Sequence, residues 1–177
     1  MSTLVILAHP EFNGSTVNKT FIEALKNEQN DDVIIHDLYA LYPDFNIDIK
    51  AEQALLSQAN RVILQAPVYW YNVTPLLKKW LDDVFQYGWA FGPGGGNLKN
   101  KSFGLVATAG GTEEKYKGMK DELPSLGACY IGMYLMFKYT GAQATPPFIH
   151  FGSTPTSNSK EQAEKAAPKY IEYVLNQ

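Results

Sequence analysis

The amino-terminal strand and the loop after it constrain the fold of this chain more than any other segment. Residues 3–8 form a short apolar run without polar alternation, which is the pattern of a strand buried on both faces of a parallel sheet. The chain then passes through a loop, from His9 to Ser15, into a segment of helical periodicity for which Ser15 is a favourable N-cap. A buried strand that leads directly into a helix predicts an α/β fold.

Strand patterns recur along the rest of the chain. They lie at residues 33–38, 61–66, 103–109 and 147–151. Helical patterns separate them, and we expect one doubly wound three-layer sandwich because parallel strands need right-handed crossover connections. The sequence contains no linker or repeat, so the prediction is a single domain over residues 1–177.

The helical segments carry recognisable start signals. They lie at residues 51–59, 75–85 and 126–139 and after residue 159. Thr74 is expected to cap the second of them, with Pro75 at its first helical position. Ser159 opens a capping box for the last helix, and Pro168 is expected to kink or split that helix.

Charge and cysteine content exclude several classes of protein. The chain has 15 basic and 18 acidic residues and no basic block, which disfavours nucleic acid as a partner. Its one cysteine, Cys129, excludes an internal disulfide, and its apolar neighbours predict a buried, inert thiol. No ligand cluster at metal spacing is present, so we predict no metal. No signal peptide or membrane-length apolar run is present, so we expect a cytoplasmic location.

The first loop has the features of an anion site. It leads into a helix amino terminus, whose first amides lack partners within the helix and carry partial positive charge. His9, Ser15, Thr16 and Asn18 add side-chain donors, so a phosphate fits here. The loop matches neither the Walker pattern nor G-x-G-x-x-G, which disfavours a nucleoside triphosphate or a Rossmann-bound dinucleotide. The alternative is an ordinary strand-to-helix turn with a structural histidine.

Two further loops follow predicted strands. Residues 67–72 include three consecutive aromatics, which either pack under the next helix or form a wall for a flat ring. Residues 108–112 include the pair Gly110 and Gly111, which forms a tight turn or lets a ligand approach bare backbone donors. Ligands of open α/β sheets bind at the carboxyl ends of strands. Together the three loops predict a phosphate pocket beside an aromatic slot, which suits flavin mononucleotide (FMN).

The same segments resemble the quinone reductase branch of the flavodoxin-like superfamily, which includes DT-diaphorase. The chain is especially similar to its bacterial NAD(P)H dehydrogenase (quinone) proteins. The matching segments are residues 8–10 with Ser15 and Asn18, then 41–46, 67–71, 75–82, 88–92 and 108–111. The resemblance implies a flavodoxin-like three-layer sandwich, with a five-stranded parallel sheet in the order 2-1-3-4-5 and helices on both faces.

The resemblance also implies site residues and a homodimer with its active site at the subunit boundary. The implied cofactor contacts are His9, Ser15, Thr16, Val17, Asn18, Pro67, Val68, Tyr69, Trp70, Tyr71, Thr108, Ala109, Gly110 and Gly111. Tyr116 stands where the family has a tyrosine that handles charge on the reduced flavin, so Tyr116, Gly110 and Gly111 are the expected catalytic residues. The family's histidine after that tyrosine has no counterpart here before His150.

The expected activity is a flavin-dependent NAD(P)H:quinone oxidoreductase that passes hydride from NAD(P)H through the flavin to a quinone. FMN is preferred because no segment plainly holds an adenosine, and FAD is the alternative. A second hypothesis is a flavin-binding regulatory subunit of a potassium–proton efflux transporter, since some similar proteins have that role. A third, an electron carrier like flavodoxin, is disfavoured by the modest net charge of −3 and by the His9–Pro10 loop. The choices between NADH and NADPH and among acceptors stay open.

Overall fold

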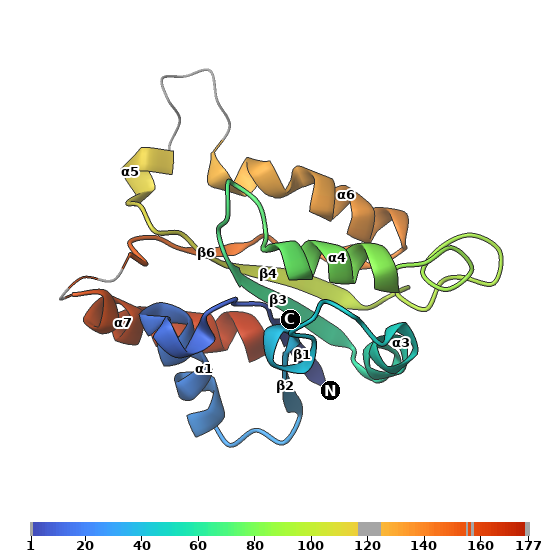
Figure 1. Ribbon diagram of the computed structural model, residues 1–177, viewed down its shortest axis with the longest axis horizontal. Coiled ribbons are helices and arrows are strands. Elements are labelled where there is room, and N and C mark those ends of the chain that lie inside the picture. The colour runs from blue at the N-terminus through green and yellow to red at the C-terminus, as the bar shows by residue number, and fades with distance from the viewer. Residues whose placement is uncertain (1, 117–124, 155, 157, 176–177) are drawn as a thin grey trace.

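The computed structural model describes residues 2–116, 125–154, 156 and 158–175. Its centre is a parallel sheet in the order β2-β1-β3-β4, which is extended beyond β4 by two short strands (Figure 1). The strands are β1 (Thr3–Leu7), β2 (Val33–Asp37), β3 (Arg61–Pro67), β4 (Ser102–Thr108), β5 (Gln143–Ala144) and β6 (Phe148–His150). The predicted flavodoxin-like α/β fold and strand order are confirmed.

The fifth position of the sheet differs from the prediction of one strand. Both β5 and β6 pair with β4, β5 at its amino end and β6 at its carboxyl end. Pro146 and Pro147 lie between them, and neither can donate to a ladder because proline lacks a backbone N–H. The edge position is therefore shared by two short strands.

Helices cover both faces of the sheet (Figure 1). One face carries α1 (Thr16–Asn27) and α7 (Ser159–Leu175), which pack against each other. The other face carries α3 (Ile49–Gln58), α4 (Pro75–Val84) and α6 (Ile131–Tyr139). Short helices are α2 (Leu38–Leu41) and α5 (Glu113–Tyr116), with single 3₁₀ turns at Phe12–Gly14 and Leu126–Tyr130. The last of these turns occupies the start of the helix expected at residues 126–139.

Stacked aromatic rings fill each layer of the core. Phe21 of α1 stacks on Tyr170 of α7 with 4.6 Å between ring centroids, and both side chains are fully buried. On the opposite face Phe103 stacks on Phe137 at the same distance. The two layers hold α1 and α7 on one side of the sheet and α6 on the other, which fixes where the strand-end loops lie.

Two helix expectations need correction. Thr74 does not cap α4 with its side chain; its hydroxyl donates instead to the Ala8 carbonyl at 3.0 Å. This bond ties the end of β1 to the start of α4. Helix α7 is not split at Pro168 but runs continuously to Leu175. One face of the helix, including Tyr170, is buried in the core, and this packing offsets the backbone hydrogen bond that proline removes.

Candidate functional site

Backbone hydrogen bonds bring the three predicted loops to one edge of the sheet. The Ala8 amide donates to the Gln65 carbonyl at 2.8 Å, and the Val68 amide donates to the Thr108 carbonyl at 2.9 Å. The ends of β1, β3 and β4 are therefore adjacent, as their order in the sheet requires. This edge is where open α/β sheets bind ligands.

Ser15 organises the start of α1. Its Oγ accepts a hydrogen bond from the Asn18 amide at 3.2 Å, so it is the N-cap that the sequence predicts. A one-turn 3₁₀ helix before it is closed by the Ser15 amide, which donates to the Phe12 carbonyl at 3.0 Å. Amides of the first helical turn, which here begins at Thr16, have no acceptor in their own helix. The loop thus presents polar hydrogens to an anion.

His9 lies half-buried directly after β1. Its Nδ1 accepts a hydrogen bond from the Glu11 amide at 3.1 Å, so Nε2 carries the hydrogen of the neutral ring. Burial lowers the pKa of His9 below its ordinary value, although the carboxylates of Glu11 and Asp37 oppose that shift. At neutral pH the ring is an uncharged donor.

The structure places the side chain of Asn18 inside the protein and not on the loop surface. Asn18 is 1% exposed; its amide nitrogen donates to Thr108 Oγ1 at 2.9 Å, and its Oδ1 accepts from Gln65 Nε2 at 3.1 Å. Tyr170 completes the network by donating to Gln65 Oε1 at 2.8 Å. These buried polar groups join α1, β3, β4 and α7 beneath the loops. Val17 is equally buried, so only its backbone faces a ligand.

The aromatic loop after β3 turns sharply. Tyr69 and Asn72 exchange two backbone hydrogen bonds of 3.0 Å each. Between them Trp70 and Tyr71 have φ angles of 48° and 62°, a left-handed conformation that is uncommon for bulky residues. Trp70 is 94% exposed, so it does not pack under the next helix. Pro67 and Val68 are half-buried at the base of the loop.

The paired glycines after β4 lie against Tyr116 and the segment that follows β6. A Cβ on Gly110 would lie 2.9 Å from Thr154 Oγ1, and one on Gly111 would lie 3.0 Å from the Tyr116 ring. The Tyr116 hydroxyl is 3.5 Å from the Gly111 nitrogen, and the ring centroids of Tyr116 and Tyr71 are 6.1 Å apart. In the described part of the chain the Gly110 amide has no hydrogen-bond partner. The expected catalytic residues thus lie together beside the aromatic loop.

Sequence reasoning missed two polar groups beneath this turn. His150 Nε2 and Ser153 Oγ are buried and find no hydrogen-bond partner among the described residues. Burial also lowers the pKa of His150. The backbone of both residues bonds to Ala109, next to the glycine turn, and the His150 ring packs edge-on against Phe21 of α1 with 5.3 Å between ring centroids. Buried polar atoms without a partner are rare, and an absent ligand or water is one physical reason for them. Only the return of β6 beside β4 brings them here, so no local pattern could have found them.

Lysines beside the first loop were also missed. A cavity of about 360 Å³ lies between the amino ends of α1 and α7, and Ser15, Thr16, Lys19 and Lys160 line it. Lys160 lies far from Ser15 in the sequence, so its proximity follows only from the packing of α7 on α1. Lys19 and Lys160 bring two positive charges to this side of the loop, against one carboxylate of the cavity lining, Glu23; Lys160 Nζ also lies 3.8 Å from Glu164 Oε1.

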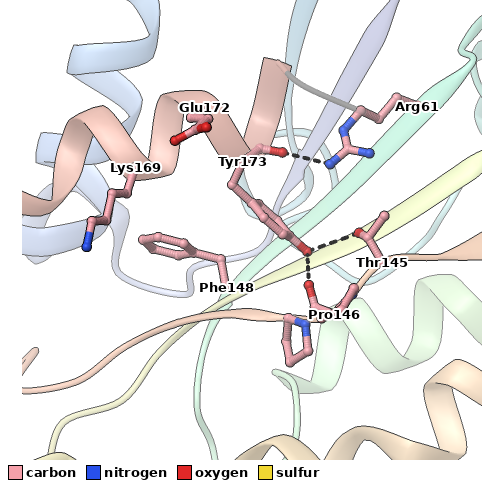
Figure 2. A pocket seen from close by; sticks show the side chains of 8 residues that line it. Arg61, Thr145, Pro146, Phe148, Lys169, Glu172 and Tyr173 are labelled. Carbon is pink, nitrogen blue, oxygen red and sulfur yellow. Dashed lines mark hydrogen bonds between the residues drawn. The ribbon is translucent and has the colours of Figure 1, made fainter.

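A larger cavity lies away from these loops. It has about 570 Å³ and is lined by Phe148, Tyr173 and Arg61, among others (Figure 2). Arg61 is the first residue of β3, and so belongs to the amino end of the sheet. Its guanidinium donates to the carbonyls of Tyr173 and Val174 and to Ser102, which anchors the end of α7. We assign this group a structural role.

Cys129 and possible metal sites add no further chemistry. Cys129 is only half-buried, in contrast to its prediction, because it borders a cavity of about 340 Å³ between α4 and α6.

Within the described residues no three His, Cys, Asp or Glu side chains gather as metal ligands would. Over the same residues, no helix has the length and apolar character needed to cross a membrane.

Three known proteins show what this chain is similar to. It is 37% identical to an uncharacterised NAD(P)H oxidoreductase, YrkL of Bacillus subtilis, over 98% of each chain. Its fold matches general stress protein 14 of Treponema denticola, solved in complex with FMN, with a TM-score of 0.89 and 34% identity over 98% of each chain. It also matches an NADPH-quinone reductase of P. pentosaceus, with a TM-score of 0.84 and 26% identity over 100% of this chain and 99% of the other.

One structural match carries a different activity in its name. A chain described as a thermophilic tryptophan halogenase of Streptomycin violaceusniger has a TM-score of 0.90 and 34% identity, over 98% of this chain and 99% of the other. The fold by itself does not decide the activity, which depends on the residues of the site. The family is decided by the sequence: residues 1–174 match the model of Flavodoxin_2, the flavodoxin-like fold. This chain belongs to the Flavodoxin_2 family.

Proposed function

We propose that the protein is an FMN-dependent NAD(P)H:quinone oxidoreductase. The observation that carries the proposal is the convergence of three features at one sheet edge: the anion loop of α1, the aromatic turn at Tyr69–Asn72 and the glycine turn after β4, whose Gly110 amide has no acceptor among the described residues. The related NAD(P)H oxidoreductase and the FMN-bound and quinone-reductase structures support the same function.

The residues present fit FMN. The first-turn amides of α1, with Ser15, Lys19 and Lys160, suit its phosphate, because donors and positive charge meet in one cavity. The exposed Trp70 and Tyr71 suit the flat isoalloxazine. The Gly110 amide, which has no acceptor among the described residues, is free for the polar edge of that ring, and Ser153, whose buried Oγ also lacks a partner among them, is bonded through its backbone to Ala109 beside this turn.

Bound FMN would supply the redox chemistry, taking hydride from NAD(P)H and passing it to a quinone. The protein contributes orientation and charge stabilisation. The Gly110 amide, which has no acceptor in the described part of the chain, is free to donate to a ring oxygen that becomes negative on reduction. The Tyr116 hydroxyl lies beside the Gly111 amide and can hold a proton at the same oxygen. Packing of Tyr116 against Tyr71 and Phe151 limits water on this side.

The test is the purified protein with NADH or NADPH and menadione. The expected result is a yellow preparation whose cofactor has the mass of FMN, with quinone-dependent oxidation of the nicotinamide. A colourless preparation that neither binds added FMN nor oxidises NAD(P)H would eliminate the proposed function.

We further infer that the protein is a homodimer. Ile131, Leu135 and Tyr139 form an i, i+4, i+8 stripe on α6 and are 57%, 61% and 74% exposed. An apolar stripe of this kind is typical of a subunit interface. Replacement of Leu135 by Glu should convert the dimer to monomer in light scattering, whereas Lys138→Glu on the same helix should not. A wild-type protein that is monomeric at all concentrations would contradict this.

An alternative is that the flavin site serves a regulatory subunit of a potassium–proton efflux transporter. The observation that favours it is exposed apolar surface outside α6: Tyr87 is 69% exposed and Leu41 53%. Under this alternative, Tyr87→Ser would abolish stimulation of the transporter in membrane vesicles and leave quinone reduction unchanged. Equal stimulation of the transporter by the wild type and by Tyr87→Ser would remove this support.

A further inference from the structure

A cavity of about 420 Å³ lies on the other side of the first loop from Lys19 and Lys160. Residues 9–14 form one wall, and Asp37, Tyr39 and Ala40 form the other. The cavity therefore opens between the carboxyl ends of β1 and β2, which are hydrogen-bonded neighbours with Leu7 opposite Asp37. It combines aromatic side chains, Phe12 and Tyr39, with polar groups.

The charged groups of this cavity are two carboxylates, and the neutral His9 adds a hydrogen-bond donor. Asp37 is the last residue of β2, and its Oδ1 accepts hydrogen bonds from the amides of Tyr39 and Ala40 at 3.1 and 3.3 Å. Its Oδ2 has no partner among the described residues. Glu11 contributes an exposed carboxylate from the opposite wall. The neutral His9 between them offsets neither charge. Hydroxyl groups suit such a site, and a phosphate does not.

The position of Asp37 has a physical precedent in nucleotide-binding α/β folds. In Rossmann folds an acidic residue at the end of the second strand accepts hydrogen bonds from the adenosine ribose of a dinucleotide. The start of α1 is assigned above to the FMN phosphate, so only this ribose contact is carried over to the donor. Here the second strand also borders the first, and two aromatic residues, Phe12 and Tyr39, line the cavity and suit an adenine. From β2 to β4 the edge spans three strand spacings, about 14 Å, which an extended dinucleotide covers.

We infer that this cavity binds the adenosine ribose of the nicotinamide donor and that Asp37 and Glu11 make the protein select NADH over NADPH. The inference rests on the proposed function and names its donor. The 2′-phosphate of NADPH would enter between two carboxylates, and like charges at such short range repel even in a solvated cavity. We expect a preference for NADH of at least about tenfold in kcat/KM, which corresponds to about 1.4 kcal/mol.

Isothermal titration of the FMN-saturated protein with two donor fragments tests the inference without catalysis. ADP-ribose should bind at least about tenfold more tightly than 2′-phospho-ADP-ribose. Asp37→Asn keeps an acceptor for the two α2 amides and should narrow this ratio about fivefold or more, chiefly by tighter binding of the phosphorylated fragment. Glu11→Gln, whose side chain supports no helix, should act in the same direction. Asp31→Asn, an equal charge change at the amino end of β2, should leave the ratio unchanged.

The outcomes separate this inference from the proposed function. Equal binding of both fragments by the wild type, or a ratio that neither Asp37→Asn nor Glu11→Gln changes, would overturn the inference while FMN binding and quinone reduction persist. If Asp37→Asn weakens FAD but neither FMN nor ADP-ribose, the cavity holds a flavin adenosine and the donor assignment is wrong. A wild type that binds no FMN and shows no turnover with either donor would defeat the proposed function; the fragment ratio would then be measured on the protein without FMN.

Discussion

Replacement of Asn18 by Leu tests whether the buried network supports the site. Leu has a similar volume but no polar atoms, so Gln65 Nε2 and Thr108 Oγ1 would lose their Asn18 partners in the protein interior. A buried polar group left without a partner costs about 1–3 kcal/mol, so the two together predict a loss of about 2–6 kcal/mol in the free energy of unfolding. For a chain of this size the melting temperature should fall by roughly 4–24 °C.

Urea denaturation followed by circular dichroism measures this loss. Asn27→Leu is the matched control, because Asn27 is exposed at the end of the same helix and its replacement should change stability by less than about 0.5 kcal/mol. The Asn18 variant should also bind FMN more weakly, since Asn18 joins the start of α1 to the end of β4. Equal stability of the two variants would refute the argument that this network holds the loops in place.

Three further predictions concern the glycine turn. Gly110→Ala should raise the Kd for FMN at least about tenfold, measured by flavin fluorescence, because its Cβ displaces the Thr154 hydroxyl and occupies the approach to the backbone. Tyr116→Phe retains the ring contact with Tyr71 and should lower kcat about tenfold or more, with little change in the Kd for FMN. His150 has a lowered pKa in the folded state, so stability should be full above its unfolded pKa and fall as pH drops below about 6.5; His150→Gln should flatten that slope in urea titrations at pH 5–7.

Each of these has an outcome that contradicts it. Gly132→Ala, with no atom near its added Cβ, is the control for Gly110→Ala, and equal FMN affinity of the two would refute the steric argument. An unchanged kcat in Tyr116→Phe would remove the hydroxyl from the mechanism. A pH slope that His150→Gln leaves intact would show that another group is responsible for it.

The sheet was predictable because its strands are encoded locally. Residues 3–8 and 61–66 are continuous apolar runs, and the observed β1 and β3 are buried along nearly their whole length. The edge of the sheet was less predictable, because the division into β5 and β6 depends on Pro146 and Pro147 at a position where a strand could otherwise have continued. Local patterns identify buried strands more readily than edge strands.

The site was predictable as a set of loops but not as a set of contacts. Thr108 lies 90 positions after Asn18, and the hydrogen bond between their side chains decides that Asn18 points inward. Lys160 and Ser153 reach the site only through the docking of α7 and β6. The left-handed turn at Trp70 follows from its paired backbone bonds, which a sequence of three aromatics does not reveal. Tertiary contacts, not local propensity, therefore determine these roles.

Anaerobic absorbance spectroscopy of the FMN-reconstituted protein tests the central claim most directly. One equivalent of NADH should bleach the flavin spectrum, and one equivalent of menadione should then restore it fully. Gly110→Ala at the same protein concentration should retain less FMN and show a correspondingly smaller change. A protein that holds no FMN, or whose bound FMN is neither bleached by NADH or NADPH nor restored by the quinone, would contradict the account.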